Sequence, residues 1–128
     1  MKYFWEYPIS GDTLAHARRG VGPATDYETP HGTPVHAPFA GRVYRYQNSD
    51  GGLSLRIVGL RYEAHMQHLS NNTLVKYGAY RLWRARIGTS GNTGKTSGPH
   101  VHAYIIVRRT GTRVSFSTWM RNYVHRGR

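Results

Sequence analysis

Apolar and polar residues alternate in short runs along most of the chain, which is the period expected of strands in an antiparallel sheet. The last of these runs, 103–107, is almost continuously apolar and is typical of a buried strand. We expect a turn followed by a long strand within 32–46, strands over 53–58, 60–68 and 103–107, and short strands or turns over 75–80 and 82–88.

Turn-forming residues separate these runs. The sequence at 48–52 predicts a tight two-residue hairpin, because Asp-Gly and Gly-Gly tolerate positive φ angles, and a second hairpin is expected at 108–112. Small and polar residues make up a ten-residue loop at 89–98, and ordered loops of this kind usually serve a site. At the ends of the chain, we expect the aromatic arm 1–15 to pack on the body and 114–124 to form one short helix.

The predicted fold is all-β, with antiparallel sheets and few short helices. The 15 glycines, 6 prolines and 10 tyrosines agree with this class, because glycine and proline punctuate strands and tyrosine suits a half-buried pleated surface. A chain of 128 residues is large enough for one core, and neither an internal repeat nor a linker divides it. We therefore expect a single domain over 1–128.

The charge is strongly basic, with 18 Lys and Arg against 6 Asp and Glu and a formal net charge of +12. Such a field attracts nucleic acid, anionic membranes and anionic cell-wall polymers alike, and the charge does not choose among them. Cysteine is absent, so any metal ion must be held by histidine and carboxylate. No segment approaches the ~18 apolar residues of a membrane span, and the first residues lack the apolar core of a signal peptide.

The most informative chemistry is the pair His100 and His102, between the loop 89–98 and the apolar run 103–107. Side chains two residues apart on a strand point to the same face. Two imidazoles on one face suggest a metal site, although two polar residues on the solvated side of a sheet would show the same spacing.

Four blocks of sequence, taken together, resemble the lysostaphin/LytM-type zinc metallopeptidases, a family of peptidoglycan endopeptidases. The blocks are 26–37, 68–70, 75–94 and 97–102, and the match extends over 26–119. The resemblance implies antiparallel sheets of the duplicated hybrid motif type, with the site in a groove flanked by loops. Residues 1–25 then form an N-terminal arm and a loop that holds a candidate first metal ligand.

The resemblance also implies roles for individual residues. Asp26 and His102 match zinc ligands of the family, and His68 and His100 match two histidines that do not bind the metal. Imidazole titrates near neutral pH, so these two side chains are suited to deprotonate water, stabilise an oxyanion and protonate a leaving amine.

The first ligand of the family is usually a histidine four residues before the aspartate, and here that position is Gly22. Catalytic zinc usually has three protein ligands. The upstream histidine is His16, and the glycines and proline of 20–23 allow the chain to fold back toward Asp26. We therefore predict His16 as the third ligand; the alternative is a domain that has lost its metal.

Four other histidines are expected to be structural or solvated: His31, His36, His65 and His125. His65 is an odd number of residues from His68, so a regular strand would turn the two rings to opposite faces. Tyr27, Tyr62 and Tyr104 are expected to pack as half-buried strand residues rather than to contact substrate. Asn92 and Thr93 are expected to serve turn geometry.

The sequence thus predicts a monomeric zinc endopeptidase that hydrolyses peptide cross-links of bacterial peptidoglycan. Its charge would hold it on anionic wall polymers. We expect a phage-type lytic enzyme that acts at the cell wall after release from the cytoplasm or delivery in a phage particle; a fragment of a larger secreted protein is an alternative. A second alternative is a catalytically degenerate domain of the same fold that binds cell wall or a partner. A nucleic-acid-binding β module is disfavoured because it leaves His68, His100 and His102 unexplained.

Overall fold

A computed structural model describes residues 2–12, 22–96 and 98–124 of the chain. The strands are β1 (Ile9–Gly11), β2 (Thr25–Tyr27), β3 (Pro34–His36), β4 (Gly41–Asn48), β5 (Gly52–Val58), β6 (Tyr62–Asn71), β7 (Ala79–Arg81), β8 (Arg86–Ser90), β9 (Val101–Val107) and β10 (Thr112–Ser115). The helical segments are a 3-10 helix, η1 (Phe4–Glu6), a single α-helical turn, α2 (Phe116–Trp119), and a π-helical turn, η2 (Met120–Val124).

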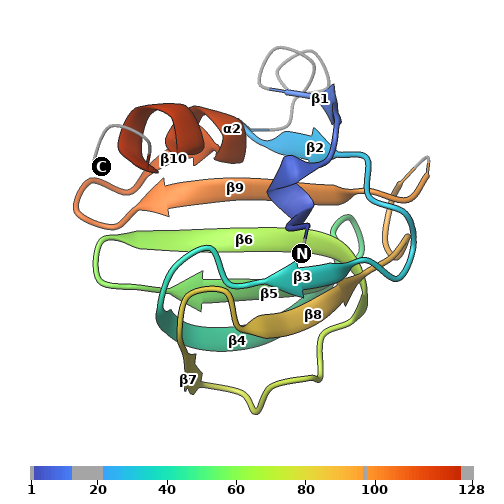
Figure 1. The fold of residues 1–128 in the computed structure, drawn as a ribbon, viewed down its shortest axis with the longest axis horizontal. Coiled ribbons are helices and arrows are strands. Elements are labelled where there is room, and N and C mark those ends of the chain that lie inside the picture. The colour runs from blue at the N-terminus through green and yellow to red at the C-terminus, as the bar shows by residue number, and fades with distance from the viewer. Residues whose placement is uncertain (1, 13–21, 97, 125–128) are drawn as a thin grey trace.

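The strands form one antiparallel sheet, in which seven follow the order β1-β2-β9-β6-β5-β4-β7. Strand β10 pairs with β9, and β8 pairs with both β6 and β3. Figure 1 shows β6 and β9 side by side at the centre, with α2 following β10 near the end of the chain. The prediction of an all-β antiparallel fold with few short helices is confirmed.

Strands β6 and β9 separate an apolar face of the sheet from a polar one. On one face the side chains are fully buried, namely Ala64, Met66, Ala103 and Ile105. Side chains alternate along a strand, so the residues between these point to the opposite face, where His65 lies opposite Tyr104 and Gln67 lies opposite His102. We call this second surface the polar face; it carries Tyr46, Glu63, His65, Gln67, His102 and Tyr104.

The apolar face is covered by the N-terminal arm and by the smaller strands. In Figure 1, η1, β3 and β8 lie over this face of the large sheet. The Phe4 ring packs with its centroid 5.6 Å from that of Tyr27 and 5.1 Å from that of Phe116. The expectation that the aromatic arm packs on the body is confirmed, with a helical turn at 4–6. Burial on one side leaves the polar face available for chemistry.

The prediction of one long strand after a turn within 32–46 is wrong, because this segment forms two strands with different partners. Strand β3 pairs with β8, whereas β4 pairs with β5 and β7. Residues 37–40, with a bend at 38–40, separate them. Pro38 lies in this bend, where it has no ladder hydrogen bond to donate.

The predicted turns are found at both hairpins. Strands β4 and β5 are joined after the pair Asn48 and Gly52, and the connection has three residues rather than the two expected. Gly52 and Gly111 take positive φ angles of 66° and 74°, as the turn sequences require. In the part of the chain that the structure describes, no helix has the length and apolarity needed to cross a membrane.

Candidate metal and catalytic site

Asp26 and His102 meet at the centre of the candidate site. They are Cα partners on the neighbouring strands β2 and β9, so their side chains leave the sheet on the same side. His102 Nδ1 lies 2.9 Å from Asp26 Oδ1. Both residues are buried, with 8% and 7% of their surface exposed, so the carboxylate and imidazole are held together with little contact with solvent.

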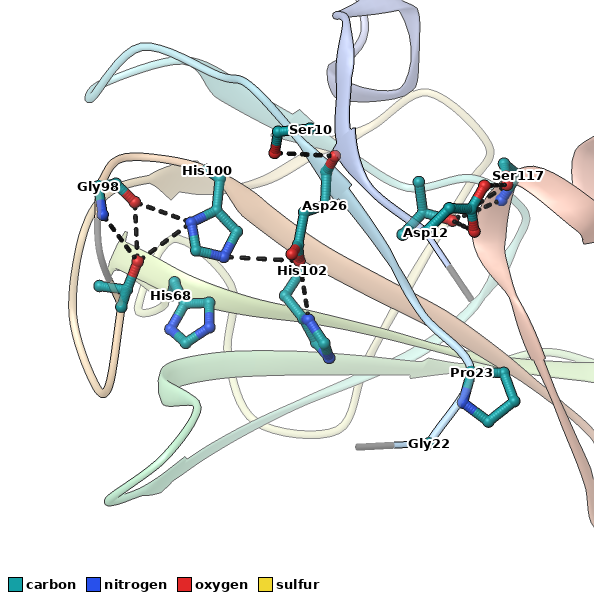
Figure 2. Close-up of polar contacts among 12 residues, drawn as sticks. Ser10, Asp12, Gly22, Pro23, Asp26, His68, Gly98, His100, His102 and Ser117 are labelled. Atoms are coloured by element: carbon teal, nitrogen blue, oxygen red, sulfur yellow. Dashed lines mark hydrogen bonds and ion pairs between the residues drawn. The ribbon is translucent and has the colours of Figure 1, made fainter. Parts of the chain in front are cut away.

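His100 approaches the same carboxylate from the loop that precedes β9. Its Nδ1 donates to the backbone oxygen of Gly98 at 2.8 Å and lies 3.1 Å from Thr96 Oγ1. Because Nδ1 is engaged with the loop, Nε2 is directed to Asp26, at 3.5 Å from Oδ1. Figure 2 shows Asp26 between His100 and His102, joined by a contact to each.

His68 joins this group because of an irregularity in β6. The register against β5 shifts so that three steps on β6, from Met66 to Leu69, oppose two on β5. His68 takes a φ of 64° at this β-bulge, and its ring centroid lies 4.7 Å from that of His100 and 5.9 Å from that of His102. The strand then continues to Asn71 instead of ending at His68.

The prediction that His65 faces away from His68 is therefore wrong. His65 stacks on Tyr104 with centroids 4.6 Å apart, on the same face as His102. Because the bulge adds one residue, the two histidines point to the same side despite their odd spacing.

Thr93 fixes the orientation of the His68 ring. A carbonyl oxygen only accepts, so His68 Nδ1 donates its proton to Thr93 O at 2.7 Å and the lone pair of the neutral ring lies on Nε2. Burial lowers the pKa of His68 from its ordinary value, which favours this neutral form. The Thr93 hydroxyl accepts from Leu53 N at 3.0 Å and donates to Leu69 O at 2.5 Å. Thr93, predicted to serve turn geometry, thus also positions His68.

The contact between Gly52 and the loop at 93–94 predicts a large effect of substitution. A Cβ at Gly52 would collide with the backbone carbonyl of Thr93 and lie 2.6 Å from Gly94 N, and the φ of Gly52 is 66°. The positive φ costs about 1–2 kcal/mol for a side chain and overpacking costs about 1–3 kcal/mol, so Gly52→Ala should lower the free energy of unfolding by about 2–5 kcal/mol. Denaturant unfolding measures this loss.

Gly111→Ala is the matched control, because Gly111 also has a positive φ but a Cβ there has no atom within 4 Å. This variant should lose only about 1–2 kcal/mol. Equal losses in the two variants would show that the contact between Gly52 and Thr93 does not hold the loop in place.

The remaining histidines lie apart from the group or bind other residues. His31 is exposed in a turn, and His36 is buried with its ring edge-on to Tyr3 at 5.0 Å. His65 Nδ1 lies 2.7 Å from the Tyr46 hydroxyl and its Nε2 lies 2.8 Å from Glu63 Oε1. Two predictions, His16 as a metal ligand and His125 as a solvated side chain, concern positions outside the described residues.

Gly22, at the position where the resemblance implies a histidine, lies against an arginine. A Cβ at Gly22 would be 3.0 Å from Cζ of Arg113. Among the described residues, no group of three or more His, Cys, Asp or Glu side chains is arranged to hold a metal ion. The described part of the site therefore supplies a carboxylate and imidazoles, without a complete set of three metal ligands.

Comparisons with known proteins agree on one family. The model of peptidase family M23 matches residues 21–116. Peptidoglycan DD-endopeptidase ShyA of Vibrio cholerae is 40% identical over 86 residues, which cover 66% of this chain and 20% of that protein. An uncharacterised metalloprotease of Haemophilus influenzae is 36% identical over 99 residues, covering 75% of this chain and 19% of that protein. The chain thus spans about a fifth of the length of these relatives.

Solved structures have the same fold. A zinc-containing peptidase from Vibrio cholerae superimposes with a TM-score of 0.72 and 30% identity, covering 84% of this chain and 35% of that one. The catalytic domain of lysostaphin from Staphylococcus simulans gives a TM-score of 0.64 and 28% identity, covering 79% of this chain and 74% of that domain. The structure of LytU superimposes with a TM-score of 0.69 and 29% identity, covering 88% of this chain and 79% of that one.

Proposed function

Because the chain belongs to peptidase family M23, we propose that it is a zinc-dependent endopeptidase that hydrolyses peptide cross-links of bacterial peptidoglycan. The observation that carries the proposal is the gathering of His68, His100 and His102 around Asp26 on the polar face. The name of the Vibrio cholerae relative, a peptidoglycan DD-endopeptidase, supports the substrate class.

Asp26 and His102 would hold the metal in this proposal. Carboxylate oxygen and imidazole nitrogen are donors that zinc takes in catalytic sites, and the chain has no cysteine to offer instead. The 2.9 Å between His102 Nδ1 and Asp26 Oδ1 brings one donor of each kind together. A zinc ion held by these residues would supply Lewis acidity, which makes bound water a stronger acid.

His68 and His100 would move the protons. His68 Nε2 carries a lone pair because Nδ1 donates to Thr93 O, so it is suited to accept a proton from the attacking water. His100 Nδ1 donates to Gly98 O, which leaves Nε2 beside Asp26 as the second atom able to exchange a proton. Peptide hydrolysis needs one group to take a proton from water and one to protonate the leaving amine, and the His68 and His100 rings would fill these two roles.

His16 would complete the ligand set. Gly22 has no side chain to bind a metal, and His16 lies ten residues before Asp26 with glycine at positions 20 and 22 between them. A catalytic zinc usually takes three protein ligands, and His16 with Asp26 and His102 gives that number.

We propose a phage-type lytic role for the chain as a monomer at the bacterial cell wall. Its net charge of +12 supports attraction to anionic wall polymers, which weakens as salt is added. Gly22 at the usual ligand position supports a second candidate, a degenerate domain that binds the wall without cutting it.

Purified peptidoglycan from several bacterial species tests the proposal. We expect the protein to clear the suspension, a chelator to stop it, and mass analysis to find fragments cut at a peptide cross-link. If none of the peptidoglycans is cleaved in a chelator-sensitive way, the proposed enzyme activity is contradicted and the degenerate domain remains as the candidate function.

A further inference from the structure

Arg113 lies beside the candidate site, on the same side of the sheet. Its position on β10 is opposite Ile106 of β9, two residues from Tyr104 and four from His102. The guanidinium carbon lies 3.5 Å from the centroid of the Tyr104 ring, whose own centroid is 6.1 Å from that of His102. A single aromatic ring therefore separates the guanidinium from the imidazole proposed to bind zinc.

Backbone carbonyl groups fix one edge of this guanidinium. Nε of Arg113 donates to Pro23 O at 2.8 Å, and Nη2 lies 3.4 Å from Gly22 O. These two nitrogens form the side edge of the planar group. The end edge, formed by the two Nη nitrogens, has no acceptor among the residues that the structure describes. Arg113 is thus oriented by two carbonyl groups while two parallel N–H groups remain available.

No described carboxylate pairs with Arg113. The chain has six acidic residues, and all of them lie in the described ranges. Arg56, which lies opposite His65 of the polar face, has Glu63 at 3.3 Å, whereas Arg113 forms no ion pair with any of the six. Burial lowers the pKa of Arg113, because desolvation disfavours its charged form. Two carbonyl groups and the face of Tyr104 hold the half-buried guanidinium, but no described carboxylate neutralises its charge, so it remains suited to bind an anion.

Gly22 makes room for the guanidinium. A Cβ at Gly22 would lie 3.0 Å from both Cζ and Nε of Arg113 and 3.2 Å from Nη1. Figure 2 shows Gly22 and Pro23 on the segment leading to β2, on which Asp26 lies. The absence of a side chain at Gly22 therefore lets a positive charge lie beside the site.

We propose that Arg113 is a specificity-determining residue that binds a free carboxylate carried by one of the two residues joined by the scissile peptide bond. The end edge of a guanidinium matches the two oxygens of a carboxylate, and such charge-assisted pairs are stronger than neutral hydrogen bonds. The inference rests on the proposed peptidase function and adds the chemistry that its substrate must carry.

Two synthetic cross-linked peptides test this role. They are identical except that one has the free carboxylate and the other has a carboxamide in its place. We expect wild type to hydrolyse the carboxylate peptide with a kcat/KM about tenfold to a hundredfold higher than that of the carboxamide peptide. Arg113→Gln should bring the ratio of these two kcat/KM values near one. Arg113→Lys should keep part of the preference for the carboxylate peptide, because an ammonium keeps the charge but lacks the two parallel N–H groups of the guanidinium.

Arg109→Gln is the control, because it removes the same charge from an exposed position in the β9–β10 hairpin and should keep the wild-type ratio. Gly22→Ala offers a variant that retains Arg113 but presses on its guanidinium, and it should lower the ratio. Thermal unfolding identifies any variant that fails to fold; if Arg113→Gln is one, Arg113→Lys and Gly22→Ala decide the matter.

A wild-type ratio near one, or a ratio unchanged by Arg113→Gln, would overturn the role of Arg113 while hydrolysis itself upheld the peptidase. Hydrolysis of neither peptide would count against the peptidase instead. Titration calorimetry with the same two peptides would then test the role of Arg113. Tighter binding of the carboxylate peptide by wild type, lost in Arg113→Gln, would support this role, and equal binding of the two peptides would overturn it.

Discussion

His102→Ala is expected to abolish both zinc binding and hydrolysis, whereas His100→Ala is expected to keep about one zinc per chain and lose only hydrolysis. His102 lies 2.9 Å from Asp26 Oδ1 on a neighbouring strand, so the two form the fixed part of the proposed ligand set. Removing a ligand leaves too few donors for zinc. His100 contacts the same oxygen at 3.5 Å and is held by its own loop.

The loss in His100→Ala should be about 10²–10⁴ in kcat, which is the usual contribution of a general acid or base. Metal content measured by atomic emission on the purified variants, together with hydrolysis of one defined peptide, separates the two roles. His31→Ala is the control, because His31 is exposed in a turn, and it should change neither quantity. Loss of zinc from His100→Ala with retention in His102→Ala would exchange the two assignments.

His16→Ala carries the second large expected effect, the loss of bound zinc together with hydrolysis. Asp26 and His102 supply two donors, and a catalytic zinc usually needs three from the protein. We expect Gly22→His in the His16→Ala background to restore part of the zinc content. A side chain at 22 would meet the guanidinium of Arg113, which would have to leave its two carbonyl acceptors to make room for the new ligand.

The same metal analysis identifies the outcomes that would contradict the role of His16. Unchanged zinc content in His16→Ala would show that another residue completes the site. Wild type purified with zinc in the buffer and still holding none would support the degenerate domain. Unfolding measured beside each metal analysis ensures that a lost metal is not a lost fold.

The fold class and part of the site could be predicted from local sequence. Period-two alternation and the glycine-rich turns predict the antiparallel strands, and the spacing of His100 and His102 places both rings on one side. The position of His68 could not be predicted in this way. Its β-bulge lies where the register of β6 against β5 shifts, and Thr93, 25 residues away in sequence, holds the ring.

Arg113 shows the same limit of local sequence. In a chain with 18 Lys and Arg, its charge looks like one more part of a basic surface. Its hydrogen-bond partner Pro23 is 90 residues away, and only the pairing of β10 with β9 brings it over Tyr104. The break of 32–46 into β3 and β4 has the same origin, since each half follows a different partner strand.

Titration of zinc into metal-free protein, with hydrolysis of a peptidoglycan cross-link peptide followed at each step, tests whether the chain is a zinc-dependent endopeptidase. We expect no hydrolysis without zinc, a rise in hydrolysis in proportion to bound metal, and saturation at about one zinc per chain. Full activity in the metal-free protein, or none at saturating zinc, would contradict this proposal.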